Sequence, residues 1–258
     1  MGGRGRIGIL GGTGLDGALD GGEVVAVETP WGDVALLVGH LDGVPVAWVA
    51  RHGPTHDVPP HRVDHRANLW ALRAAGCHQV VGVQNVGGLT ATQRPGDLVV
   101  PANLIDLSGR VVTVFEGPDV VHVDLTEPFC PVVRAALLQG AGDVHDGGVY
   151  LQTAGPRLET AAEVRRLASL GDVVGMTAAS EATVARELGL CYASLCLVAN
   201  PAAGLAEGRL AAADLAAAMK DAQTKVLAAV AGSAKRLLDA EVAGCGCAEA
   251  PELGRLSP

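Results

Sequence analysis

The sequence predicts a single α/β domain built on a central mixed β-sheet flanked by helices. Short apolar runs rich in Val, Ile and Leu alternate with stretches of helical length and pattern. Residues 190–198 form a nearly continuous apolar run, which is typical of a strand covered on both faces. Neither an internal repeat nor a linker divides the 258 residues, so one domain is expected.

Strands predominate in the first half of the chain. The first apolar run leads into a glycine-rich loop, and the next three are joined by turns that contain Gly or Asp. A helical stretch follows and ends at Gly76, a residue type suited to the position just past a helix. The expected elements are strands at 6–10, 24–28, 34–39 and 45–50, a helix at 61–75, and a strand at 79–83.

Helices predominate in the second half. Pro128 lies near the start of one helical stretch, and Gly171 and Gly189 lie just past the ends of two others. The last stretch is Ala-rich, but its charged residues exclude a membrane-spanning helix. The expected elements are helices at 127–139, 160–169 and 180–188, the strand at 190–198, and a helix at 211–240. The domain is expected to occupy residues 1–240, with a mobile C-terminal tail at 241–258.

The overall charge bears on the partners of the protein. With a formal net charge of −9, the chain is expected to bind neither nucleic acid nor an anionic membrane. An anionic substrate would need a local cationic pocket, for which Arg51 and His52 are candidates. The apolar run at 7–10 is too short for a signal peptide, so a cytoplasmic protein is expected.

Six cysteines fall into two groups. Four lie in apolar or helical surroundings that favour buried free thiols: Cys77, Cys130, Cys191 and Cys196. The other two form Cys245-Gly-Cys247 in the tail, where two sulfurs make half of a zinc site and nothing nearby completes it. We expect no metal there, while a redox or disulfide role of this pair stays open.

Histidines at positions 52, 56, 61 and 65 also raise the question of a metal. His61 and His65 are four residues apart on the expected helix, a spacing that can chelate. Two prolines separate them from His56, however, and no cysteine or nearby carboxylate pair completes a coordination sphere. Solvated or packing roles are expected for these side chains.

The glycine loop at 12–17, GTGLDG, matches the dinucleotide pattern G-x-G-x-x-G after a strand. A dinucleotide-binding fold needs a helix straight after this loop and then a parallel strand. Residues 18–22, ALDGG, and closely spaced strands follow instead, which argues against that fold. The loop can present Thr13 and backbone N–H groups to a phosphate, and a tight turn without a ligand is the alternative.

Two stretches place one polar residue each in apolar or small-residue surroundings. They are YLQTAGPRLET at 150–160, which contains Glu159, and CYASLCLVANP at 191–201, which contains Asn200. They resemble the trimeric purine nucleoside phosphorylase and methylthioadenosine phosphorylase family, and the resemblance spans about residues 7–235. It implies the nucleoside phosphorylase fold, a homotrimer, a nucleoside and inorganic phosphate as substrates, and neither cofactor nor metal.

The resemblance assigns a set of phosphate-binding residues. Arg51 and His52 follow the strand expected at 45–50, and a planar guanidinium suits bidentate phosphate binding. The matched positions are Thr13, Arg51, His52, Thr177 and the backbone of Asn85. Where the chain has Gln84 and Asn85, family members usually have small or hydroxylated residues, so Gln84 enters as a substrate-binding candidate whose side-chain role stays open.

Glu159 and Asn200 indicate which base is bound. A carboxylate can accept from the N1–H and 2-amino groups of a 6-oxopurine, and an amide can hold N7 and O6 together. In the adenine-specific branch of the family an aspartic acid donates to the base and is paired with a second one two residues on; here these positions are Asn200 and Ala202. The catalytic candidate is therefore Asn200, with Leu158 and Met176 as further substrate-binding candidates.

Two residues concern the 5′ end of the sugar. Ala213 lies where general 6-oxopurine enzymes of the family carry a histidine, and a small apolar wall suits a methylthio group. His122 resembles a residue that family members lend to the neighbouring subunit. The resemblance thus implies phosphorolysis of S-methyl-5′-thioinosine to hypoxanthine and 5-methylthioribose 1-phosphate. A general inosine/guanosine phosphorylase, a methylthioadenosine phosphorylase, a nucleosidase that uses water, and a non-catalytic purine-binding relative are the alternatives.

Overall fold

The computed structural model describes residues 5–12, 19–205, 212–240 and 245–256, with the backbone alone at 212–219 and 221. The strands are β1 (Arg6–Gly11), β2 (Asp20–Val27), β3 (Val34–Leu41), β4 (Val44–Ala50), β5 (Cys77–Gly88), β6 (Leu98–Val100), β7 (Asn103–Asp106), β8 (His145–Asp146), β9 (Val149–Gln152), β10 (Val173–Gly175) and β11 (Cys191–Pro201). The helices are α1 (His65–Ala74), α2 (Pro131–Gly140), α3 (Ala161–Leu167), α4 (Ala178–Glu187), α5 (Ala212–Asp239) and α6 (Ala250–Leu253).

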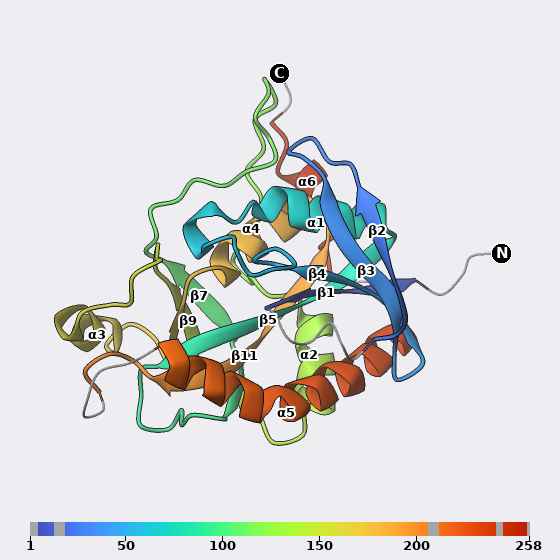
Figure 1. The fold of residues 1–258 in the computed structure, drawn as a ribbon. Helices are drawn as coiled ribbons and strands as arrows, with labels where there is room; N and C mark the ends of the chain where they lie inside the picture. Colours follow the sequence, from blue (N-terminus) through green and yellow to red (C-terminus); the bar gives the residue numbers. More distant parts are fainter. Residues whose placement is uncertain (1–4, 13–18, 206–211, 241–244, 257–258) are drawn as a thin grey trace.

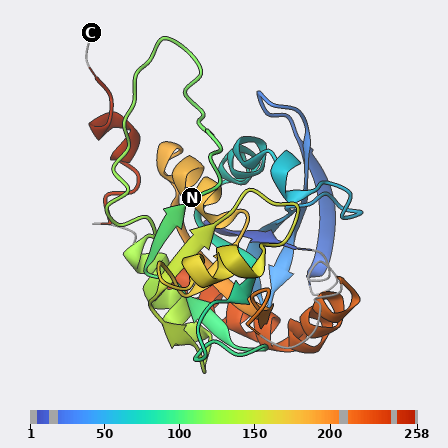
Figure 2. The same ribbon diagram turned by 90° about the vertical axis from the view of Figure 1, so that its left-hand side faces the viewer.

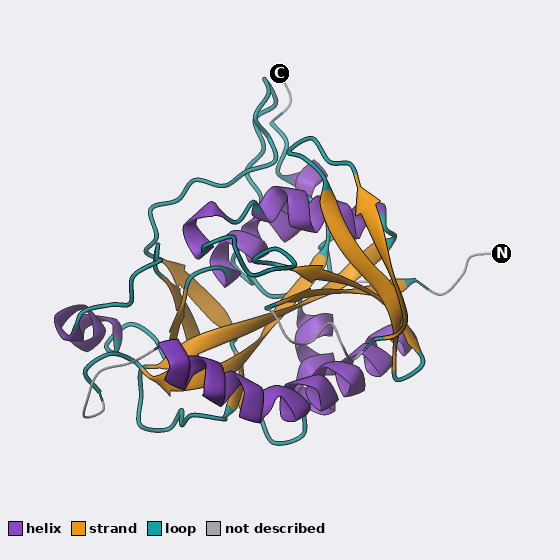
Figure 3. Ribbon diagram, viewed as in Figure 1, coloured by secondary structure: helices purple, strands orange, loops and turns teal. Residues whose placement is uncertain are grey.

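These elements form three layers, in which one sheet lies between two layers of helices. Helices α1 and α4 lie over one face of the sheet, and α2 and α5 lie over the other (Figures 1 and 3). Strands β4, β1, β5 and β11 run parallel at the centre, β3 and β2 extend the sheet antiparallel beyond β4, and β6 and β8 lie beyond β11. The predicted class, an α/β domain with a mixed sheet flanked by helices, is confirmed.

Strand β5 changes its neighbour halfway along, and this opens the sheet. Its first part pairs with β1 up to Gly82, whereas its end pairs with β10 from Gly87 onward. On its other side β11 pairs with β5 along almost the whole length. Residues 83–86 therefore face the carboxyl end of β1 between two diverging strands, the kind of place where α/β sheets bind ligands.

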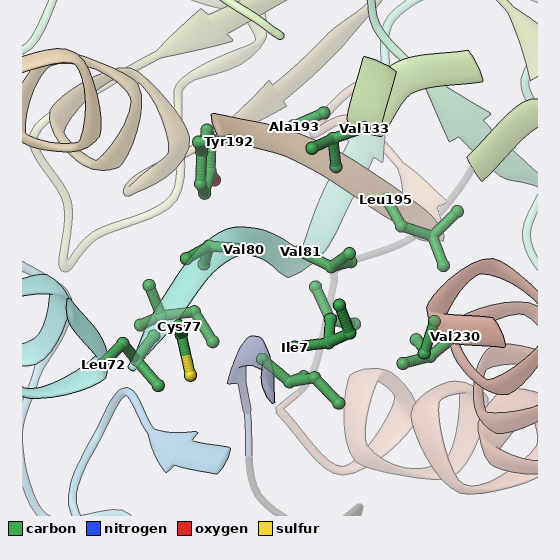
Figure 4. Packing of buried hydrophobic residues seen from close by; sticks show 14 of the residues in the cluster. Ile7, Leu72, Cys77, Val80, Val81, Val133, Tyr192, Ala193, Leu195 and Val230 are labelled. Atoms are coloured by element: carbon green, nitrogen blue, oxygen red, sulfur yellow. The ribbon is translucent and has the colours of Figure 1, made fainter. Parts of the chain in front are cut away.

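Apolar side chains from both helical layers pack on this central strand. Adjacent residues of β5 point to opposite faces of the sheet, which explains its apolar sequence. Leu72 of α1, Cys77 and Val80 close around Gly8 of β1, where an added Cβ would lie within 3.3 Å of all three. Figure 4 shows Val80 and Val81 among side chains contributed by α1, α2, α5 and β11. Each large aliphatic side chain buried in this way contributes roughly 1.5–3 kcal/mol to stability.

The observed element boundaries differ from the predicted ones for local reasons. Helix α1 begins at His65 rather than at residue 61, because the side chain of Asp64 accepts hydrogen bonds from the first-turn N–H groups of Arg66 and Ala67. A 3₁₀ turn at Pro60–Arg62 precedes it. Strand β5 is longer than the predicted 79–83, and the short strands β6 to β10 were not predicted at all.

The C-terminal segment packs on the domain over the part that the structure describes, residues 245–256. Cys247 is 1% exposed, and Gly254 accepts a backbone hydrogen bond from His122 at 2.8 Å. Figure 2 shows α6 beside the long loop between β7 and α2. This packing does not agree with the prediction of a mobile tail over these residues. Among the described helices, none is both long and apolar enough to cross a membrane.

Candidate active site

A cavity of about 590 Å³ opens where β5 leaves β1. Gly12, from the end of the first strand segment, borders it. The cavity is lined by ten of the residues proposed from the sequence: Arg51, His52, Gln84, Asn85, Leu158, Glu159, Met176, Thr177, Asn200 and Ala202. These positions are spread over about 150 residues of sequence, and the fold brings them to one cavity.

Arg51 closes the gap between the diverging strands. Its Nη2 donates to the carbonyl of Leu10 at the end of β1 (3.1 Å), and its Nη1 donates to the carbonyl of Val83 on β5 (3.0 Å). The guanidinium thus satisfies backbone acceptors that a sheet ladder would otherwise use. Its remaining bonds go to Glu181, through Nε and through Nη2 (3.3 Å).

The ion pair of Arg51 with Glu181 is buried at the base of the cavity. The side chains of Arg51 and Glu181 are 3% and 0% exposed. Although burial opposes it, the carboxylate of Glu181 raises the pKa of Arg51, so the guanidinium stays charged. Four of its five N–H groups already donate to the protein. This geometry leaves one Nη1–H for a phosphate, so it does not support the expected bidentate binding by Arg51.

Glu181 also organises the neighbouring wall of the cavity. Its carboxylate accepts from the amide of Gln84 (2.8 Å) and from the hydroxyl of Tyr192 (2.7 Å). Because the amide nitrogen of Gln84 faces a carboxylate, its oxygen faces Thr177, whose hydroxyl donates to it at 2.6 Å. Gly82 makes room for this network, since a Cβ there would lie 2.2 Å from the Tyr192 hydroxyl. Gln84 thus positions Thr177 and has few bonds left for a substrate.

His52 is neutral at pH 7 in this structure. Its Nδ1 lies 2.9 Å from the carbonyl oxygen of Val58, so Nδ1 carries the proton and Nε2 is an acceptor. Burial, followed by the positive charge of Arg51, lowers the pKa of His52 to about 4. The expected donation from this imidazole to an anion requires a proton first. Neutral His52 can instead accept a hydrogen bond at Nε2 from a protonated anion.

The first N–H groups of α4 are occupied by side chains. Gln152 accepts from the backbone N–H of Ala179 (2.8 Å) and of Ser180 (3.2 Å). The hydroxyl of Tyr150 accepts from Thr177 and Ala178 at 3.3 and 3.4 Å. The helix N-terminus therefore orients Thr177 at the cavity wall, while its dipole stabilises the buried carboxylate of Glu181 in the first turn.

Glu159 and Asn200 lie at another part of the cavity wall, and both are half-buried. Glu159 accepts a hydrogen bond from the hydroxyl of Thr153 (2.6 Å), which orients the carboxylate and leaves Oε2 available. The amide nitrogen of Asn200 donates to the carbonyl of Pro201 at 2.6 Å. Ala202, beside Asn200, is buried and apolar. This wall combines one acceptor-only group with one amide that can both donate and accept.

Three further candidates do not fall on the described cavity wall. Thr13 lies outside the described residues, and Ala213 lies in α5 where the structure describes the backbone only. His122 is exposed and lines a separate surface depression with Arg186 and residues of the C-terminal segment. Within one chain, His122 is therefore not part of the cavity that holds Arg51.

Two buried groups that the sequence reading missed complete the site. Glu181 and Tyr192 lie on α4 and β11, and neither has a sequence motif around it. The one available signal was an acidic residue inside the apolar pattern of the helix expected at 180–188. A charged residue on the buried face of a helix needs a partner, and Arg51 is that partner here.

His65 leads to a prediction about acid stability. Its side chain is 0% exposed, 3.7 Å from Glu181, and burial lowers its pKa to about 4. The unfolded chain binds this proton near the ordinary value of 6.5, so stability is full above pH 6.5 and falls toward pH 4. The shift corresponds to about 3 kcal/mol at most. His65→Gln should flatten the fall in Tm between pH 6.5 and 4; equal slopes in both proteins would contradict this.

The cavity at the sheet opening has an arginine and a histidine at one wall and a carboxylate and an amide at another. This arrangement defines an α/β protein whose site suits an anion beside a polar ring. The chain matches the family model described as the Phosphorylase superfamily over residues 6–235. This match covers most of the sequence, and the chain belongs to that family.

Individual relatives support the same assignment. A probable S-methyl-5′-thioinosine phosphorylase of Methanothermobacter thermautotrophicus is 46% identical over 209 residues, which are 79% of this chain and 74% of that protein. The S-methyl-5′-thioadenosine phosphorylase of Pyrococcus horikoshii is 38% identical over 251 residues, covering 95% and 96% of the two chains. A solved methylthioadenosine phosphorylase from an antarctic soil metagenomic library superposes with a TM-score of 0.90 at 31% identity, covering 98% of this chain and 93% of that one.

Proposed function

We propose that this chain is an enzyme that cleaves the N-glycosidic bond of 6-oxopurine nucleosides with inorganic phosphate. One observation carries the proposal: Glu159 and Asn200 line the same cavity as Arg51, His52 and Thr177. Groups suited to a purine and groups suited to an anion thus share one space. Relatives named for a thioinosine and for a thioadenosine substrate both match this chain, so the choice of base rests on these residues.

The anion end of the cavity would hold phosphate as the nucleophile. Cleavage of the bond between the sugar and the base develops positive charge on the sugar, and a phosphate fixed beneath it stabilises that charge. The free Nη1–H of Arg51 donates to it, and neutral His52 and Thr177 accept from a protonated phosphate oxygen. Binding thus favours a phosphate that carries a proton toward His52.

The base end of the cavity would stabilise the departing purine. A 6-oxopurine leaves with negative charge spread over N7 and O6, and the amide N–H₂ of Asn200 can donate there once it leaves the carbonyl of Pro201. The carboxylate of Glu159, oriented by Thr153, accepts from N1–H. Adenine presents a bare N1 to this carboxylate and needs a proton at N7 that an amide cannot supply, so adenine is disfavoured.

Finer parts of the proposal concern the sugar and the assembly. Ala213 suggests S-methyl-5′-thioinosine as the preferred substrate, with inosine and guanosine as the second candidates. His122 is exposed, and it lies on a loop whose Val111 and Val120 have exposed fractions of 93% and 49%. This exposed apolar surface supports a homotrimer in which each chain lends His122 to its neighbour. Phosphate is a substrate, and no cofactor takes part.

Phosphate dependence tests the reaction class. With S-methyl-5′-thioinosine, we expect hypoxanthine release only when phosphate is added, together with a sugar 1-phosphate detected by phosphorus NMR. A nucleosidase would release the base at the same rate without phosphate and give the free sugar. A non-catalytic relative would bind hypoxanthine and release nothing. Either result would contradict the proposal.

A further inference from the structure

The sulfur atoms of four cysteines from three separate parts of the chain lie together in the fold. All four lie within 4.8 Å of one another, and those of Cys191 and Cys245 are 3.4 Å apart. Cys130 precedes α2, Cys191 begins β11, and Cys245 and Cys247 belong to the C-terminal segment. The expectation that nothing completes the half-site of Cys245 and Cys247 is therefore wrong, because two of the other cysteines do.

We propose that Cys130, Cys191, Cys245 and Cys247 bind one zinc ion. Zinc takes four thiolates in a tetrahedron with bonds of about 2.3 Å, which places neighbouring sulfurs about 3.8 Å apart. The observed separations, from 3.4 Å to within 4.8 Å, bracket that value. Four protein ligands leave no open position, so the ion has a structural role. Each thiol gives up its proton to solvent as the metal binds.

The surroundings of the cluster suit such a site. Cys130 is the residue directly before the first turn of α2, so it lies at the N-terminus of a ten-residue helix. The partial positive charge of a helix N-terminus stabilises a thiolate. Three of the four cysteines are buried, and Cys245 is half-buried. Gly246 has a φ of +68°, which a residue other than glycine adopts rarely, and it allows the chain to turn between the two tail cysteines.

The ion would join the C-terminal segment to the domain and, through it, the long loop before α2. Beyond the cysteines, this segment pairs with the loop: His122 N–H donates to Gly254 (2.8 Å), Leu256 N–H donates to Val120 (3.0 Å), and Arg255 contacts Asp119 (2.7 Å). Zinc would therefore hold the backbone that carries His122. The consequence for the neighbouring active site rests on the proposed function, whereas the metal site itself does not.

Metal content of the intact protein tests the site without any assay of activity. Purified in reducing buffer without chelator, the protein should carry about one zinc per chain by plasma mass spectrometry. Cys191→Ser and Cys247→Ser should each reduce the zinc content at least tenfold, whereas the matched control Cys77→Ser, in the core beside Leu72, should keep it. Cobalt substituted for zinc should show the intense thiolate charge-transfer absorption of a tetrahedral site.

Three results would overturn the proposal. The first is a protein that carries no metal and in which the four cysteines form two disulfides. Its mass, measured after denaturation, would then be lower than that of the reduced chain by the hydrogens lost when the disulfides form. The second is iron in place of zinc at the same stoichiometry. The third is full zinc content in Cys191→Ser together with a wild-type cobalt spectrum. Because Cys191→Ser could fail to fold, the half-buried Cys245 provides a second variant, Cys245→Ser, with the same expected loss of zinc.

Discussion

Replacing Arg51 with methionine is expected to weaken phosphate use strongly and to destabilise the fold at the same time. The substitution removes the donors to Leu10 and Val83 and leaves the fully buried carboxylate of Glu181 without its cation. Breaking one side of a buried ion pair costs about 3–5 kcal/mol. The loss of a fixed charge and donor at the reacting anion lowers kcat/KM for phosphate by about 10²–10³-fold. Thermal unfolding and steady-state kinetics measure the two effects.

A double variant separates the two effects of Arg51. In Arg51→Met with Glu181→Gln, the buried site is neutral, and the amide oxygen introduced by the second change can still accept from Gln84 and Tyr192. Most of the lost Tm should return, while the loss in kcat/KM for phosphate remains. If the double variant regained wild-type phosphate kinetics, Arg51 would be a residue of the scaffold only, and its place at the anion end would be wrong.

Asn200→Asp is expected to shift the preference from hypoxanthine toward adenine nucleosides. A carboxylic acid can give a proton to N7 of adenine, whereas a carboxylate would repel the anion of a departing 6-oxopurine. The new carboxylate would also be repelled by the carbonyl of Pro201, which now accepts from the amide at 2.6 Å, and would turn to the cavity. The ratio of kcat/KM for methylthioadenosine over methylthioinosine should rise about tenfold to a hundredfold.

Glu159 provides the matched second change. Adding Glu159→Ser to Asn200→Asp removes the carboxylate that faces the bare N1 of adenine, so the ratio should rise further. Asn200→Ala is the control, because it should lower the rate on both nucleosides without raising the ratio. An unchanged ratio in Asn200→Asp would show that this side chain does not distinguish the bases.

The sequence predicted most of the cavity wall but little of what supports it. Arg51, His52 and Thr177 were found because they follow strands or lie in short motifs of a known family. Glu181, the partner of Arg51, was not found, because the two residues are 130 positions apart and meet only when the end of β4 and helix α4 come together in the fold. The same reason explains why Arg51 was assigned two donors for phosphate, when its bonds to Leu10, Val83 and Glu181 already use four.

Long-range assembly also explains the cysteines and the sheet. Cys130, Cys191 and the tail pair lie far apart along the chain, and Cys191 and Cys245 are 54 positions apart, so no spacing rule connects them. Strand β5 was predicted too short because its last residues, Val86, Gly87 and Gly88, resemble a loop until β10 and β11 pair with them. Local patterns predict the elements, whereas partners across the sheet determine where they end.

The central claim, that the site binds a 6-oxopurine, is tested most directly by comparing two substrates of the wild-type protein. The measurement is the ratio of the rates of base release from S-methyl-5′-thioinosine and S-methyl-5′-thioadenosine with saturating phosphate. A site that combines Glu159 with Asn200 should favour the thioinosine by about 10⁴-fold, because adenine leaves buried polar groups unpaired. Equal rates, or faster release of adenine, would contradict the assignment of both residues to a 6-oxopurine.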